Sequence, residues 1–142
     1  MKKSLTIVVT VIAAVIGGAF GKAIVKSMFQ RGDPVSFDQV LVETSKKINA
    51  TLPMQVDKET RMDATMAGPG NRITYLYTLI NLSSADLEQK TFIDAMRPQL
   101  LNGYRTDPDM AAFRKKEVEL HYHYRDRHGN AVATIVVSPK DF

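Results

Sequence analysis

The sequence predicts an α+β domain in which helices cover one face of a four-stranded antiparallel sheet, behind an apolar N-terminal segment. Apolar residues recur at helical spacing after Ser36 and again after Ser83, and two pairs of alternating segments flank turn-forming residues. A chain of 142 residues has room for one hydrophobic core and not for two. The expected order over residues 36–142 is therefore α-β-β-α(α)-β-β in two layers.

The first helix is predicted from its N-terminal cap. Ser36 and Gln39 have the spacing of a capping box, and an apolar row follows on one helical face to about Asn49. Pro53 then ends the helix.

The first strand pair is predicted from alternation and turn chemistry. Strand-like spacing begins at Val56, and a second run rich in β-formers extends from Arg72 to Leu82. Gly68-Pro69-Gly70-Asn71 between them indicates a hairpin turn. We reject a phosphate-binding loop here because no Lys-Ser/Thr pair and no helix follows.

The second helical region is predicted to begin at Ser83. Pro98 should kink or divide this helix, and Gly103 should end it. Thr106-Asp107-Pro108-Asp109 has the composition of a new helix start, which explains both aspartates without catalysis.

The last strand pair carries the only metal-like spacing in the chain. Val118–Tyr124 and Ala131–Val137 alternate around a polar turn, and Glu119, His121 and His123 share one face of the first strand. Two histidines at i and i+2 beside a carboxylate could bind a metal. We favour a solvated strand face, so no metal and no cofactor are expected.

The N-terminus carries an uninterrupted apolar segment. Residues Ser4 to Gly21 include no charge and would span about 27 Å as a helix, with further apolar residues to Val25. This predicts a transmembrane anchor within residues 1–26, followed by a linker at 27–35. The same residues also fit a cleavable signal peptide, and both interpretations export residues 36–142.

Two glycines in this segment suggest a contact between membrane helices. Gly17 and Gly21 form a GxxxG pair, which lets two helix backbones approach closely in lipid. A homodimer through this face is a secondary hypothesis, because small residues are also common at signal cleavage sites.

The charge pattern argues against nucleic acid as a partner. The chain has 19 basic and 15 acidic residues, and the excess comes from Lys2, Lys3, Lys22 and Lys26 around the apolar segment. The remainder is formally neutral and lacks the basic surface that binds phosphate backbones. The absence of cysteine excludes disulfides, thiolate metal sites and a thiol nucleophile.

A charged segment offers the best candidate for a binding surface. If the segment is a strand, Asp57, Glu59, Arg61 and Asp63 lie on one side as a ladder that could recognise a partner. A solvated edge strand that resists aggregation is the alternative. Asp57, Thr60 and Arg61 are the binding residues that we select.

Several short motifs resemble those of a family of small, largely uncharacterised bacterial proteins with an N-terminal signal or anchor. They follow the pattern LPxxVDxxTR…YxY…YxDxxG and include Leu52, Pro53, Val56, Asp57, Thr60, Arg61, Tyr75, Tyr77, Tyr124, Asp126 and Gly129. The resemblance covers residues 37–141. It implies the bacterial envelope and no particular activity, and the cysteines that such proteins often carry are absent here.

Two classes of function remain at this point. We favour a non-catalytic protein of the bacterial inner membrane, single-pass through residues 4–25, whose periplasmic domain binds another protein or an envelope component. A periplasmic or secreted form after signal cleavage is the alternative placement. The alternative function is a small metal-dependent or hydrolytic enzyme that uses His121, His123 and Glu119.

Overall fold

The computed structural model describes residues 36–142, which form an α+β domain built on one mixed five-stranded sheet. The helices are α3 (Phe37–Asn49), α4 (Gln89–Thr106) and α5 (Ala111–Lys115). The strands are β1 (Met54–Gln55), β2 (Thr60–Ala67), β3 (Arg72–Leu79), β4 (Glu119–Arg125) and β5 (Ala131–Val137). Short 3-10 turns at Ser84–Asp86, Pro108–Met110 and Pro139–Asp141 complete the order.

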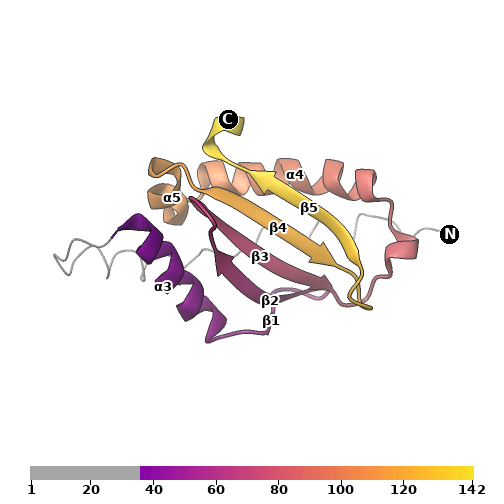
Figure 1. Ribbon diagram of the computed structural model, residues 1–142. Helices are drawn as coiled ribbons and strands as arrows, with labels where there is room; N and C mark the ends of the chain where they lie inside the picture. Colours follow the sequence, from indigo (N-terminus) through magenta and orange to yellow (C-terminus); the bar gives the residue numbers. More distant parts are fainter. Residues whose placement is uncertain (1–35) are drawn as a thin grey trace.

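The sheet differs from the prediction in two respects. Its order is β1-β2-β3-β4-β5, with a short first strand that we did not predict, and β3 and β4 are parallel where we expected an antiparallel sheet (Figure 1). The cause is the connection between them, because α4 crosses over and returns the chain to the end of the sheet where β3 starts. The other strand pairs are antiparallel as predicted.

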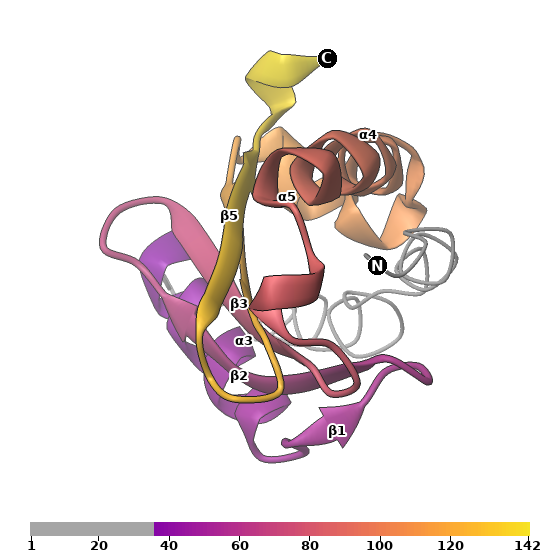
Figure 2. The same cartoon turned by 90° about the vertical axis from the view of Figure 1, so that its right-hand side faces the viewer.

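Both long helices lie on the same face of the sheet. The Ser45 hydroxyl on α3 lies 2.9 Å from that of Thr65, which stands directly opposite Tyr75 in the β2–β3 ladder. On α4, Phe92 packs edge-on against Tyr124, which neighbours Tyr77 in the β3–β4 ladder. Figure 2 shows α4 on one side of β5. The prediction of helices on one face is thus correct.

The first helix forms as predicted. Ser36 and Gln39 make both hydrogen bonds of the capping box, and α3 runs to Asn49. Beyond it, the strand spacing predicted from Val56 begins only at Thr60, because residues 56–59 form a turn.

The second helix corrects two predictions. It begins at Gln89, after a separate 3-10 turn that contains Ser84, and it continues through both Pro98 and Gly103 to Thr106. Burial explains this continuity, because Phe92, Met96, Leu100 and Tyr104 form one row that packs against the sheet. Asp107 then caps the next turn, as predicted.

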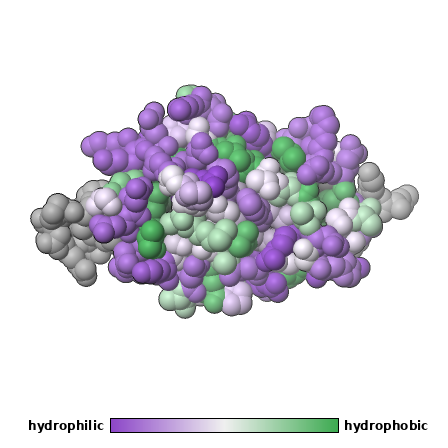
Figure 3. All heavy atoms as spheres, viewed as in Figure 1, coloured by the Kyte–Doolittle hydropathy of each residue, from purple (hydrophilic) through white to green (hydrophobic). Residues whose placement is uncertain are grey.

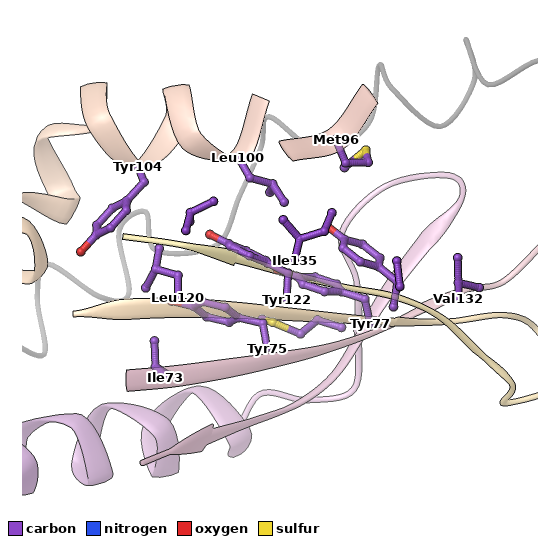
Figure 4. Packing of buried hydrophobic residues seen from close by; sticks show 14 of the residues in the cluster. Ile73, Tyr75, Tyr77, Met96, Leu100, Tyr104, Leu120, Tyr122, Val132 and Ile135 are labelled. Carbon is purple, nitrogen blue, oxygen red and sulfur yellow. The ribbon is translucent and has the colours of Figure 1, made fainter. Parts of the chain in front are cut away.

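The core lies between the sheet and the helices and is rich in tyrosine. Tyr75 stacks on Tyr122 with ring centroids 5.2 Å apart, and Tyr77 stacks on Tyr124 at 5.1 Å. Figure 4 shows Tyr75, Tyr77 and Tyr122 along β3 and β4, below the row from α4. Burial raises the pKa of each of these tyrosines, so they serve the core as neutral aromatic groups.

Predictions about the N-terminus fall outside the described residues. They comprise the membrane segment or signal at residues 4–25, the linker at 27–35 and the helix contact through Gly17 and Gly21. Within residues 36–142, no helix is long and apolar enough to cross a bilayer.

Candidate functional site

The charged segment is divided between the two faces of the sheet. Thr60 begins β2 and is buried, whereas Arg61 is the next residue and its side chain is nearly half exposed. Neighbouring strand residues point to opposite faces, so the structure does not bring Arg61 to the surface that Asp57 and Thr60 occupy. The expected four-residue ladder is wrong, because Asp57 precedes β2 in a turn.

Asp57 and Thr60 lie together in the turn before β2. One Asp57 carboxylate oxygen, Oδ1, accepts the backbone N–H groups of Glu59 at 2.6 Å and Thr60 at 2.9 Å. Burial raises the pKa of Asp57, and these backbone bonds oppose that rise. Asp57 Oδ2 and Thr60 Oγ1 are buried and find no hydrogen-bond partner among residues 36–142. Asp57 therefore organises the turn and stays partly exposed, whereas Thr60 is buried.

The open face of the sheet carries a second group, which we call the arginine cluster: Arg61, Asp63, Thr78 and Arg125. Arg61 Nε donates to Asp63 Oδ1 at 2.6 Å, and Arg125 Nη2 lies 3.3 Å from Asp63 Oδ2. The Thr78 hydroxyl donates to the same carboxylate. A register row aligns the cluster, since Arg61 lies opposite Thr78 and Thr78 lies beside Arg125.

The cluster holds one anion between two cations. Burial alone would raise the pKa of Asp63, but the hydrogen bonds from Thr78, Arg61 and Arg125 outweigh it and lower that pKa. Asp63 thus stays ionised at neutral pH and keeps both guanidinium groups in place. The side chains of Arg61 and Arg125 are 45% and 44% exposed, which leaves donor groups free to meet an acidic partner.

Sequence reasoning found only part of this cluster. The sequence pattern places Arg61 and Asp63 on one side of the same strand. Arg125 lies far along the chain, so the pattern does not connect it with them. The parallel pairing of β3 with β4 brings it into the row, and no local pattern predicts that pairing.

The strand β4, which we call the histidine strand, carries Glu119, His121 and His123 on one face, as expected. The Nε2 atom of His121 lies 2.8 Å from Glu119 Oε1, and His123 is next on the same face. Burial, with the charges of His121 and Arg72, lowers the pKa of His123, which favours its neutral form. Within residues 36–142, no three His, Cys, Asp or Glu side chains are placed to hold a metal ion.

The open face is mixed in polarity. Figure 3 views the molecule from this side, and apolar residues over the middle of the sheet are interspersed with hydrophilic ones. Met66 and Val136 are among the exposed apolar side chains. Such a surface offers both apolar contact and charge to a partner.

The chain belongs to a family defined by a domain of unknown function (DUF8479), which matches residues 36–133. This agrees with the resemblance to an uncharacterised family. No functionally curated protein matches the chain.

Three solved structures share the fold. A protein of Pseudomonas aeruginosa assigned as secreted superposes with a TM-score of 0.60 and 14% identity, over 70% of this chain and 87% of that one. The type II secretion system pilotin AspS of Vibrio cholerae gives 0.56 and 9%, over 82% and 98%. The type II secretion pilotin EpsS of Vibrio vulnificus gives 0.57 and 9%, over 72% and 88%. At these identities the likeness shows the fold alone.

Proposed function

We propose that this chain is an exported, non-catalytic protein of the bacterial envelope whose domain binds another protein. The apolar segment at residues 4–25 supports export, and the fold shared with a secreted protein and two secretion-system pilotins supports an envelope role. Retention in the inner membrane with the domain in the periplasm, or release after signal cleavage, are the two placements that this proposal includes.

One observation carries the binding role, and it is the arginine cluster on the open face. Two half-exposed guanidinium groups share one carboxylate, so the cluster presents a net positive charge of one. The single anion fixes both arginines in position, which lowers the entropy that a partner must remove on binding. The chemistry that this arrangement fits is an acidic segment of a protein, held through paired N–H donors.

The test is capture of the partner by cross-linking in native membranes. We expect the double variant Arg61→Gln/Arg125→Gln to reduce the captured partner at least tenfold, because both guanidinium groups and their positive charges are removed. Asp63 is only 16% exposed and keeps its hydrogen bond from Thr78 in this variant, so circular dichroism must show that the variant domain remains folded.

A matched control comes from α4. Arg105 is exposed and donates to the nearby Asn102, outside the arginine cluster, so Arg105→Gln should leave capture unchanged. Raising the salt concentration should weaken capture by the wild-type chain, since exposed charges are screened. Equal capture by the wild-type and double-variant chains would refute a role for the cluster.

A further inference from the structure

The free edge of the sheet is a second surface with a specific character. β5 stands last in the strand order and has only β4 as a strand neighbour within residues 36–142. Its sequence, AVATIVV, contains no charge, proline or glycine. Edge strands that must stay unpaired usually carry lysine, proline or a bulge in their middle, and here the register shift is confined to the start of β5.

The opposite edge shows how this fold closes an edge that it does not use. There β1 is only two residues long, and beyond it the Asn49 side chain of α3 pairs with the backbone of β2 at Thr65. Its carboxamide accepts from the backbone N–H of Thr65 at 2.7 Å and donates to the backbone C=O of Thr65 at 2.9 Å. Asn49 thus occupies the hydrogen-bonding positions that another strand would take. Among residues 36–142, no side chain pairs with the outer backbone of β5 in this way.

A hollow lies at the start of the free edge. It has a volume of about 180 Å³ and is lined by Ser84, Leu87, Gln89, Ala131 and Val132. A cavity of roughly 150 Å³ can hold benzene in another protein, so this one has room for one aliphatic or aromatic side chain. The edge therefore combines unpaired backbone with a recess for an anchor residue.

The position of α4 decides which occupant fits. Figures 1 and 2 show α4 running along β5 on the helix-covered side. In a second copy paired antiparallel through β5, α4 would lie on the same side of the joined sheet as the first α4, so the two helices would also have to pack against each other. A single extended segment without a covering helix meets no such obstacle.

We propose that β5 binds an extended, uncharged segment of a partner protein as an added strand, with one apolar side chain of that segment in the hollow. This deepens the proposed function and rests on it, because it specifies how a partner is held. Main-chain hydrogen bonds to β5 supply affinity, and the hollow supplies specificity. The segment of the partner should be uncharged, because β5 carries no charged side chain that could pair with a charge on it.

The first test uses a synthetic probe and the wild-type full-length chain in detergent. The probe is a capped, fluorescent seven-residue peptide of alternating threonine and valine with leucine at both ends. We expect saturable binding by fluorescence anisotropy and slower hydrogen exchange of β5 amides. Two N-methylated versions of the peptide serve as controls. Each blocks the backbone N–H groups along one edge of the peptide and keeps all its side chains. We expect one of the two versions to bind at least tenfold more weakly than the unmodified peptide.

Two variants test the hollow. Ala131→Trp fills it and should weaken peptide binding at least tenfold, whereas Val42→Trp on the exposed side of α3 should not. No saturable binding, or undiminished binding of both N-methylated peptides, would overturn strand addition. A wild-type dimer by light scattering that Ala131→Trp dissociates would also overturn it, in favour of a second copy.

The outcomes separate this inference from the function on which it rests. If membrane capture depends on Arg61 and Arg125 while the peptide fails to bind β5, the binding role stands and strand addition falls. If the peptide binds as expected while capture ignores both arginines, the edge is a binding site and the arginine cluster is not.

Discussion

At the scale of single residues, the polar side chains with the most hydrogen bonds serve the backbone. Asp126 is fully buried and accepts from the backbone N–H groups of Ser84 at 2.8 Å, His128 at 2.8 Å and Asn130 at 2.9 Å. Its carboxylate therefore joins the β4–β5 turn to the segment before α4. Asp57 organises the turn before β2 in the same way. These two aspartates of the family-like pattern thus maintain the fold.

Asn49 gives a residue-scale prediction about the protected edge. Asn49→Ala removes the donor and acceptor that pair with the Thr65 backbone, and it leaves a part-buried N–H and C=O without their partner. We expect the free energy of unfolding to fall by about 1–3 kcal/mol, the usual cost of unsatisfied buried polar groups. Urea denaturation followed by circular dichroism measures this.

Asn102 on α4 provides the comparison for that prediction. Its side chain is exposed and only accepts a hydrogen bond from Arg105, so Asn102→Ala should change stability by less than about 0.5 kcal/mol. Equal effects of the two alanine variants would mean that Asn49 does not secure the edge.

At the scale of elements, α4 shows packing overriding local propensity. Pro98 and Gly103 are helix-breaking residues, yet the helix includes both because four buried side chains on one face hold it to the sheet. The same helix makes the crossover that turns β4 parallel to β3. One element thus accounts for the wrong helix end and for the wrong direction of β4, but not for the additional strand β1.

Gly103 and Gly129 make a matched prediction about backbone conformation. Gly103 is helical with no atom within 4 Å of an added Cβ, so Gly103→Ala should stabilise the domain by about 0.5–1 kcal/mol. Gly129 has φ +85° in the β4–β5 turn, so Gly129→Ala should destabilise it by about 1 kcal/mol or more. Thermal unfolding of both variants measures the difference, and a shift of the same sign in both would contradict this account.

At the scale of the whole molecule, the sheet separates two roles. One face carries the helices and the tyrosine-rich core, and the other carries the arginine cluster and the histidine strand. The histidines share the open face with Arg61 and Arg125, but the row of contacts links only the arginines to Asp63. The arginine cluster thus lies at one end of β4, and Glu119 with Arg72 beside it lies at the other end.

Because the core lies entirely between the sheet and its own helices, we predict that residues 36–142 fold without the N-terminal segment. The core of this fragment is formed by its own helices and strands, and roughly 105 residues suffice for a stable domain. We expect one cooperative thermal transition with unchanged midpoint on adding zinc. A gradual transition would show that the domain needs residues 1–35, and a large shift with zinc would favour the metal-dependent alternative.

The sequence by itself determined the α+β class, the first helix with its capping box, both strand hairpins and the family-like motifs. These depend on spacing and caps within a few residues, which local physics specifies. Only the tertiary structure decided the parallel β3–β4 pairing, the course of α4, the arginine cluster and the free β5 edge. These features depend on contacts between distant segments, such as Asp63 with Arg125. In α4, the free energy gained by burying one helix face exceeds the tendency of a proline or glycine to end the helix.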